Sequence, residues 1–451
     1  MGNAVLALLV FIGIIIFWNV FLKRNIGEAM FFGFIGTALF GGTQAPQLIW
    51  DGLVYAATYE VMYAALAFVF MSYLIDRTEV LSGMLLILNS IFGRLPGGAA
   101  YIDTIASAAM GTLAGSGSAN TAATGAFTAP WMVKTNWSRE LAATVVAGNG
   151  GLGTALPPSS SMFIMLGFAP VAALVSEVNI YVALFVAGAY QVLYRIILIM
   201  YLVRKHKIKA VSPEFVQPLS HSLRAGWKSL FIFLGALIPM IITIGPVSEM
   251  LAANPNIGEE AIGSISLITW IPILIIFIGL IVGWTKLPKS STDWSKFLNN
   301  AIPRFAYIGA ILLFAFAAGE VLSNLGLAED LTTLMETLSI SKWLMVAIIG
   351  VLVVLVAGPL SSTATLTAVG MISFSALISV GVHPVAAVIC ILVFASTEGS
   401  SPPASGSIFI SAGLAGADPK KMFVPLIAYY VVPIFIIGWL IGMGVLPLPI
   451  H

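Results

Sequence analysis

Residues 153–163 read GTALPPSSSMF, and they interrupt an apolar region with two adjacent prolines and three serines. Proline has no N–H group and cannot continue the interior of a helix, so Pro157 and Pro158 predict that a helix ends here. The carbonyl groups freed by such a break need other partners, because unpaired buried backbone groups cost free energy. The stretch therefore predicts a break that presents backbone and hydroxyl oxygens inside the protein.

The rest of the chain has the composition of a membrane protein. Of its 451 residues, 59% are hydrophobic and only 9% are charged, whereas a soluble domain carries about 25% charged residues. So few charges cannot cover a water-exposed surface, and the sequence predicts an all-α polytopic membrane protein. The formal net charge of +1 gives no electrostatic argument for nucleic-acid binding.

The proline motif has a second copy in SSPPAS, residues 400–405. Pro402 follows Pro157 by 245 positions, and the hydroxyl-rich stretches SGSANTAATG (116–125) and SSTATLTAVG (361–370) are separated by the same 245 positions. Small residues in one such stretch would be explained by close helix packing. Two copies in one register instead indicate an internal repeat with a site in each half.

The repeat predicts the organisation of the chain. We expect a first membrane half over residues 1–209, with its motif region at about 111–168, and a second half over 229–451, with its motif region at about 355–416. Residues 210–228 mix prolines, polar and apolar residues, and we expect them to form a cytoplasmic interfacial connector. Residues 79–94 are charged at both ends and too short to span the bilayer, which favours an interfacial helix.

Broken helices inside a membrane protein can bind ions of either sign. Freed carbonyls and hydroxyls are suitable ligands for a small cation, and freed N–H groups at a helix start favour an anion. Both arrangements occur at the discontinuous helices of secondary transporters. We therefore interpret the Pro-Pro motifs as tips of re-entrant hairpins beside a cation and a substrate site.

Two segments also resemble a known family: GRLPGGAAYIDTIASAAMGTLAGSGSANTAATGAF (93–127) and GNGGLGTALPPSSSMF (148–163). They are similar to the large, DctM-like membrane subunit of tripartite ATP-independent periplasmic (TRAP) transporters, through its LPGG entry, its SGSS-x-AT turn and its LG-x-x-x-PPS turn. The similarity is strong over residues 93–168 and weaker over 355–416. It implies an elevator-type transporter of the ion transporter superfamily, built from two inverted repeats that each contain a re-entrant hairpin and a broken helix.

The resemblance also implies partners and a location. Sodium would be the coupling ion, and transport would require an extracytoplasmic solute-binding protein and a small four-helix membrane subunit. The expected location is the cytoplasmic (inner) membrane of a bacterium or archaeon.

Site residues follow from the same resemblance. A first sodium site would use oxygens of Ser116, Gly117, Gly153, Leu156 and Pro158. A second sodium site would use Gly358, Ser361, Thr363, Glu398 and Ser401. Substrate would lie near Ser118, Asn120, Thr121, Ser159 and Thr365. We expect Ser160 and Ser161 only to cap the helix that follows.

This chain departs from the family pattern at two of these positions. Asn120 stands where the family usually has threonine, and Glu398 replaces a glycine. An acid beside a cation site either adds charge attraction or binds a proton instead. Glu60, Asp103 and Glu320 are further carboxylates in apolar segments; such groups are either functional or paired with an arginine or a helix end.

The sequence therefore predicts a sodium-coupled importer of a small organic anion, such as a carboxylate or sulfonate, and not an enzyme. It contains no GxxxxGK[ST] loop for nucleotide phosphates and no His, Cys and Asp cluster with metal-enzyme spacing. SANTAATGAF (118–127) also resembles the divalent-anion/sodium symporters, so a self-sufficient sodium or proton symporter is one alternative. A non-transporting membrane scaffold subunit is another.

Overall fold

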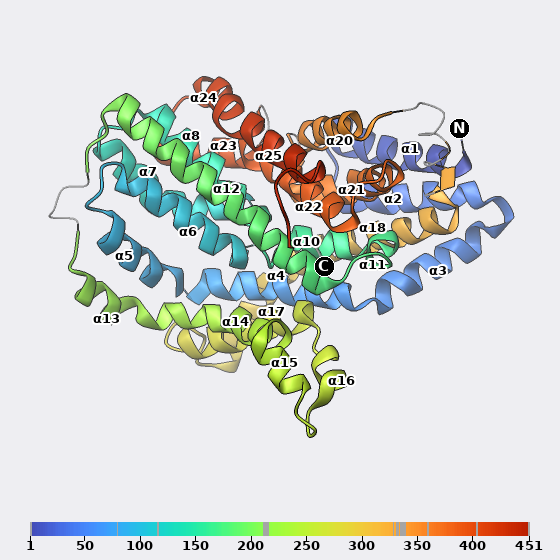
Figure 1. Cartoon of the computed structure of the whole chain (residues 1–451), viewed down its shortest axis with the longest axis horizontal. Coiled ribbons are helices and arrows are strands. Elements are labelled where there is room, and N and C mark those ends of the chain that lie inside the picture. Colours follow the sequence, from blue (N-terminus) through green and yellow to red (C-terminus); the bar gives the residue numbers. More distant parts are fainter. Residues whose placement is uncertain are drawn as a thin grey trace.

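The computed structural model describes residues 2–78, 80–114, 117–210, 216–327, 329–330, 333, 340–358, 360–402 and 405–449. Every regular element within these ranges is helical (Figure 1). Four helices there are long and apolar enough to cross a membrane: Glu177–His206, Leu219–Thr243, Ser362–Ser379 and Pro419–Gly442. Two bent pairs raise this number to six if each counts as one span. The all-helical polytopic membrane fold agrees with the sequence prediction.

The first motif region forms a hairpin followed by a broken helix. Helices α6 (Gly98–Ala114) and α7 (Gly117–Lys134) pack against each other, and the residues that join them, 115 and 116, lie outside the described ranges. Next come α8 (Arg139–Gly150), α9 (Leu152–Ala155) and α10 (Ser160–Leu166). Pro157 and Pro158 lie in the break between α9 and α10. The prediction that these prolines form the hairpin tip is therefore wrong, because they lie in the break of a helix that follows the hairpin of α6 and α7.

The second motif region repeats this order. It consists of α20 (Lys342–Ala357), α21 (Ser362–Ser379), α22 (Pro384–Ala395), η5 (Ser396–Ser400) and α23 (Gly406–Ala415). Helix α21 begins and ends 245 positions after α7, and α22 begins and ends 245 positions after α8. The register found from two short motifs therefore extends to whole helices.

The two repeats pack reciprocally. Helix α7 packs against α23, and its counterpart α21 packs against α10, so each hairpin contacts the segment that follows the break of the other repeat. Figure 1 shows α21 and α22, in orange, next to the green α10. This reciprocal packing of the two repeats is the arrangement expected of two halves related by a pseudo-two-fold axis.

Further helices complete the core of the two repeats. The first repeat continues through α11 (Ala169–Ala172) into α12 (Glu177–His206), which packs against α6, α9 and α22. The second continues through α24 (Pro419–Leu426) and the π-helical turn η6 (Ile427–Val431) into α25 (Val432–Gly442), which packs against α22.

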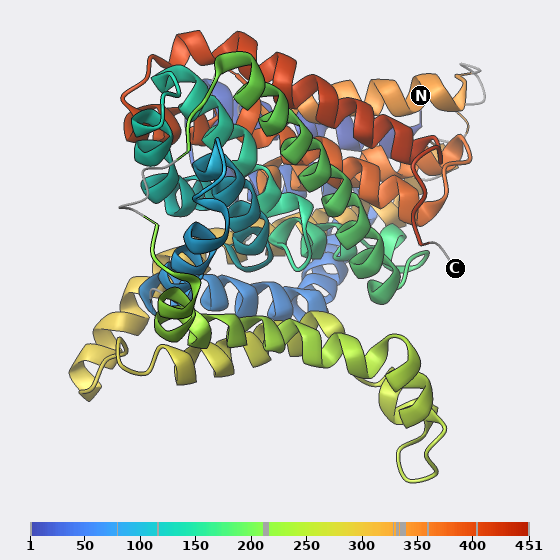
Figure 2. The ribbon, with the colours of Figure 1, turned by 60° about the vertical axis from the view of Figure 1, so that its left-hand side comes forward.

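A separate layer of helices, here called the outer layer, flanks the repeats. Its members are α1 (Asn3–Ile16), η1 (Phe17–Phe21), α2 (Ile26–Ala38), η2 (Leu39–Gln44), α3 (Ala45–Thr58), α4 (Glu60–Thr78), α17 (Leu267–Val282) and α18 (Ser291–Asn324). Helix α18 packs against α2, α3 and α4, and α17 packs against α4. Figure 2 shows the blue α3 and α4 and the yellow α17 below the repeats.

The described part of the predicted connector, residues 210 and 216–228, is largely helical. Helix α13 begins at Leu219 and runs to Leu230, and it continues through η4 (Phe231–Phe233) into α14 (Leu234–Thr243). It packs against α5 (Val80–Phe92), where a Cβ atom at Gly83 would lie 2.9 Å from Gly226 Cα. The mixture of polar and apolar residues is thus that of an amphipathic helix with one packed side. Beyond α14, α15 (Pro246–Ala252) and α16 (Gly258–Gly263) project from the body (Figure 2).

Candidate functional site

The two helix breaks meet at the centre of the repeat pair. Gly151 follows α8, and Ser396, its counterpart 245 positions later, follows α22. A Cβ atom at Gly151 would overlap the Ser396 carbonyl oxygen, and one at Gly399 would lie 2.9 Å from the Ala147 oxygen. Equivalent residues of two repeats touch only near the axis that relates them. The twin motifs therefore contribute to one central site.

Each hairpin also reaches the break of its own repeat. A Cβ atom at Gly358 would lie 3.6 Å from the Pro402 oxygen and 3.8 Å from Ser401 Cβ. In the first repeat, a Cβ atom at Gly111 would contact the Leu152 oxygen and lie 3.2 Å from Gly153 Cα. The arrangement brings together the hairpin and break segments that the resemblance assigns to each sodium site.

The residues predicted for the first sodium site lie in these segments. Gly117 begins α7, Gly153 lies in α9, and Leu156 and Pro158 lie in the extended break. Ser116 lies outside the described residues.

In the second predicted sodium site, several oxygens already have protein partners. Ser361 caps α21, its hydroxyl accepting from the Ala364 N–H at 3.2 Å. The Thr363 carbonyl accepts from Thr367 Oγ1 at 3.1 Å, and Ser401 Oγ donates to the Thr397 carbonyl at 2.9 Å. The hydroxyls of Ser361 and Ser401 each keep a lone pair that a cation could use, whereas the Thr363 carbonyl lies within α21 and also accepts the helical N–H four residues later.

Three residues predicted to contact substrate carry buried oxygens that have no hydrogen-bond partner among the described residues. Asn120 Nδ2 donates to the carbonyls of Ser107 (3.0 Å) and Gly150 (3.3 Å), but its Oδ1 accepts no hydrogen bond from the described residues. Thr121 Oγ1 and Thr365 Oγ1 are likewise buried without a partner in the described part of the chain. Buried polar atoms are normally paired, so these three oxygens are candidates to bind a ligand.

The other two predicted substrate residues differ. Ser118 lies beside the start of α23, its hydroxyl 3.0 Å from the place of a Cβ atom at Gly406. Ser159 is the N-cap of α10, accepting from the Met162 N–H at 3.2 Å and donating to the Thr154 carbonyl at 3.4 Å. The capping role predicted for Ser160 and Ser161 therefore belongs to Ser159, because the cap is the last residue before the helical turn.

Glu398 lies between the two repeats. Its Oε2 accepts from the Ser362 N–H at 3.1 Å, and the same oxygen lies 3.2 Å from the place of a Cβ atom at Gly117. Ser362 begins α21 and Gly117 begins α7, so the carboxylate stands at the N-termini of two helices, where negative charge is stabilised. It is only 5% exposed.

Sequence reasoning missed Arg195, a fully buried residue of α12. Its Nη2 donates to the Gly148 carbonyl at 3.1 Å, near the C-terminus of α8, and its Nη1 donates to Gln191 Oε1 at 3.0 Å. The same Gln191 oxygen accepts from Ser396 Oγ at 3.2 Å. Arg195 therefore links the two breaks. The sequence feature that could have identified it is a charged residue in the middle of an apolar helix.

The three other carboxylates considered above, Asp103, Glu60 and Glu320, accept hydrogen bonds from hydroxyl or amide groups, and Glu60 also stands in the first turn of α4, at a helix end. Asp103 accepts from Thr128 Oγ1 at 2.5 Å and from Asn149 Nδ2 at 2.8 Å, and it is fully buried. Glu60 accepts from the Thr269 hydroxyl at 2.5 Å. Glu320 accepts from the Asn324 amide at 3.3 Å. These contacts indicate packing roles.

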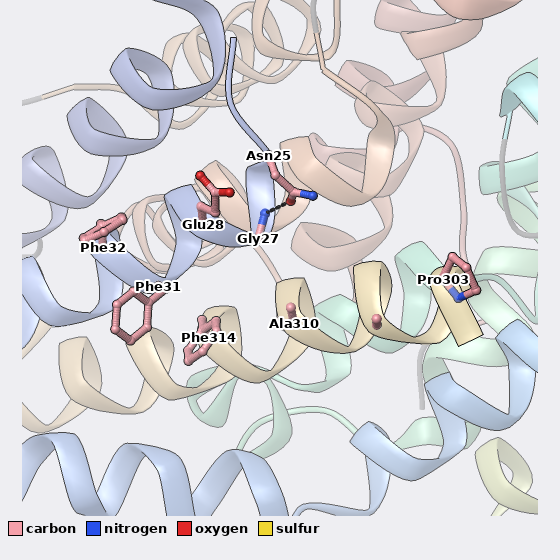
Figure 3. A pocket seen from close by; sticks show the side chains of 9 residues that line it. Asn25, Gly27, Glu28, Phe31, Phe32, Pro303, Ala310 and Phe314 are labelled. Carbon is pink, nitrogen blue, oxygen red and sulfur yellow. Dashed lines mark hydrogen bonds between the residues drawn. The ribbon is translucent and has the colours of Figure 1, made fainter. Parts of the chain in front are cut away.

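A groove of about 560 Å³ lies apart from this site, between α2 and α18 (Figure 3). It is lined by Asn25, Gly27, Glu28, Phe31, Phe32, Pro303, Ala306, Ala310 and Phe314. None of these residues belongs to the repeated motifs, so the groove is a feature of the outer layer and not of the central site.

Solved transporters share the fold. The structure matches the YdaH transporter of Alcanivorax borkumensis with a TM-score of 0.64 and 15% identity, covering 89% of both chains. It matches Neisseria gonorrhoeae MtrF, described within a class of antimetabolite efflux pumps, with a TM-score of 0.65 and 11% identity, covering 89% of this chain and 85% of the other. At such identities the likeness concerns the fold alone.

Sequence comparison is more specific. The isethionate TRAP transporter permease protein DctMQ of Oleidesulfovibrio alaskensis is 24% identical over 344 residues, which cover 75% of this chain and 50% of that protein. The chain thus spans half the length of this curated relative. Residues 4–447 match the family described as the tripartite ATP-independent periplasmic transporter, DctM component. The chain therefore belongs to the DctM component family of TRAP transporters, multi-pass membrane permeases and not enzymes.

Proposed function

We propose that this chain imports a small organic anion by sodium-coupled secondary transport, as the transport subunit of a TRAP system. The observation that carries the proposal is the contact of the two helix breaks at Gly151 and Ser396. Beside it, next to Gly150, lie Asn120 and Thr121, whose buried side-chain oxygens have no hydrogen-bond partner in the described part of the chain. A permease needs such a site between its halves, so that one ligand can be held by both.

The chemistry of the site supports a cation and an anion together. Carbonyl and hydroxyl oxygens near the breaks favour a hard cation such as sodium. The N-termini of α7 and α21 favour an anion. Binding both ions in one place gives the coupling that secondary transport requires.

The substrate class is a proposal drawn from the same site and from the relative. That relative is named for isethionate, a small sulfonate, and a carboxylate offers similar oxygen chemistry. An extracytoplasmic solute-binding protein and a small four-helix membrane subunit are the proposed partners. In the proposed elevator motion, the two repeats move together against the outer layer.

Uptake by the reconstituted protein tests this function. Proteoliposomes containing the chain and both partners should accumulate a small carboxylate or sulfonate under an inward sodium gradient. Equal uptake in potassium would contradict sodium coupling.

The same preparation separates the two alternatives. Uptake by this chain alone would favour a self-sufficient symporter. Unchanged uptake by the complex carrying both Ser118→Ala and Asn120→Ala would favour a scaffold subunit.

A further inference from the structure

We propose that a groove in the outer layer binds one phospholipid whose headgroup carries an ethanolamine ammonium. The groove is the hollow of about 560 Å³ between α2 and α18 (Figure 3). None of its lining residues belongs to the repeated motifs, so this site is separate from the central site and needs neither sodium nor substrate. The inference therefore goes beyond the proposed function and does not depend on it.

The groove is long enough for one acyl chain. A second hollow of about 440 Å³, between α1 and α2, shares Phe32 with it and reaches Gly36 and Leu39. From Asn25, at the start of α2, to Leu39 the helical rise gives a length of about 21 Å. One leaflet of the hydrocarbon core is about 15 Å thick. The two hollows together therefore extend through the depth of one leaflet.

The lining of the groove suits a flexible chain better than a helix. Helices approach each other closely in a membrane where small residues line the contact, whereas aromatic rings stand along this groove. Phe31 packs on Phe314 with ring centroids 5.1 Å apart. Phe32 packs on Trp18 with ring centroids 4.5 Å apart. Beyond these rings, no described atom lies within 4 Å of the place of a Cβ atom at Gly13, so space remains for the end of an acyl chain.

A carboxylate stands at one end of the groove. Glu28 is exposed in the first turn of α2, and its Oε2 accepts from Trp18 Nε1 at 3.2 Å. The indole is neutral, so it orients the carboxylate without balancing its charge. A charged group that faces lipid is costly unless it is paired. A ligand that brings a cation to this end of the groove would supply a counter-charge.

Basic residues beside Glu28 place this end of the groove at the membrane surface. Lys23 and Arg24 are exposed and directly precede Asn25, which lines the groove. Long basic side chains at the end of an apolar span reach the headgroup region, where they attract lipid phosphate. Asn25 Oδ1 accepts from the Gly27 N–H at 2.7 Å (Figure 3), and the Asn25 amide nitrogen is a further donor for a phosphate oxygen.

These opposite charges favour one headgroup. Phosphatidylethanolamine carries a phosphate and an ammonium with three N–H donors, so it can contact Lys23 through the phosphate and Glu28 through the ammonium. Phosphatidylcholine has no N–H to donate. Phosphatidylglycerol has no cation, and its net negative charge is repelled by Glu28. The expected affinity is therefore highest for phosphatidylethanolamine.

Lipid-dependent stabilisation of the purified, full-length protein tests the site. The protein is delipidated in a mild detergent, and its thermal unfolding is followed while one dioleoyl phospholipid is added. Phosphatidylethanolamine should stabilise the protein at a lower concentration than phosphatidylcholine or phosphatidylglycerol with the same acyl chains. An equal response to the ethanolamine and choline lipids would overturn the proposal.

Glu28→Gln tests the contact with the ammonium. Glutamine can still accept from Trp18 but carries no charge. The concentration of phosphatidylethanolamine at half-maximal stabilisation should rise about tenfold, as for loss of one hydrogen bond to a charged group, and the preference over phosphatidylcholine should disappear. Glu320→Gln is the matched control, because this carboxylate of α18 accepts from Asn324 and lies outside the groove. A wild-type lipid concentration for Glu28→Gln would contradict the proposal.

Ala306→Trp tests the place of the acyl chain and serves if Glu28→Gln does not fold. Ala306 lines the groove and is exposed, so an indole there fills the hollow without entering the core. The response to phosphatidylethanolamine should weaken, whereas Leu355→Trp, at an exposed position of α20, should leave it unchanged. If Ala306→Trp instead keeps the lipid response but prevents co-purification of the small membrane subunit, the groove holds a helix of that partner and the lipid proposal is wrong.

Discussion

The carbonyl oxygen of Ser396 lies where any side chain on Gly151 would have to be, although 245 positions separate the two residues. Both follow the first part of a broken helix, α8 in one repeat and α22 in the other. The backbones of the two breaks can approach this closely because residue 151 has no Cβ atom. The contact places the two predicted motifs in one site.

Gly151→Ala should therefore destabilise the protein. The added methyl group would overlap the Ser396 carbonyl, and overpacking of this kind costs about 1–3 kcal/mol. Thermal unfolding in detergent should show a lower midpoint, and uptake should fall as well. Gly413→Ala in α23 is the control, because nothing lies within 4 Å of its Cβ position. Equal midpoints for the two variants would contradict the contact.

Thr365→Val should weaken ligand binding while leaving stability unchanged. The Thr365 hydroxyl is buried without a partner in the described part of the chain, so the folded protein loses no hydrogen bond when it is removed. Sodium-driven uptake should need more substrate or more sodium for half-maximal rate.

Thr135→Val is the matched control for this prediction. Thr135 Oγ1 already donates to the Trp131 carbonyl at 2.9 Å, and Thr135 follows the end of α7, so this variant should keep its affinities. If Thr365→Val has wild-type affinities, Thr365 does not contact a ligand.

Arg195→Met should destabilise the protein more than Arg195→Lys. Methionine cannot replace the hydrogen bonds to Gly148 and Gln191, and hydrogen bonds from a charged group contribute about 1.5–3 kcal/mol. Lysine retains the positive charge near the C-terminus of α8, where it is favourable. Thermal unfolding of the two variants gives the comparison. Equal stability would contradict the inference that the hydrogen bonds of Arg195 stabilise the packing of the two breaks.

Asp103→Asn should lower the stability of the folded protein without changing the sodium concentration that gives half-maximal uptake. The carboxylate accepts from both Thr128 and Asn149, whereas an asparagine amide would turn its own donor toward one of them. Leaving a buried donor unsatisfied costs about 1–3 kcal/mol. If this variant needs more sodium for half-maximal uptake, Asp103 acts on the cation and not only on the packing of α6, α7 and α8.

Local chemistry explains why the helix ends could be predicted. Pro157 and Pro158 end a helix whatever surrounds them, because the missing N–H is a property of the residue itself. The offset of 245 positions was equally visible, and it predicted which helices would be alike, as α7 and α21 are. Residue type alone did not decide which residue caps α10 or that a helix begins at Leu219. Both depend on the geometry of the folded chain.

The sequence by itself determined the membrane-spanning character, the repeat and the position of its breaks, since these depend on composition and on residues close together in the chain. Only the tertiary structure decided that Ser396 meets Gly151, that Glu398 faces the hairpin of the other repeat and that Arg195 links the two breaks. Such contacts join residues that are far apart in the chain. They are set by how whole helices pack, and a local pattern carries no information about the partner across the interface.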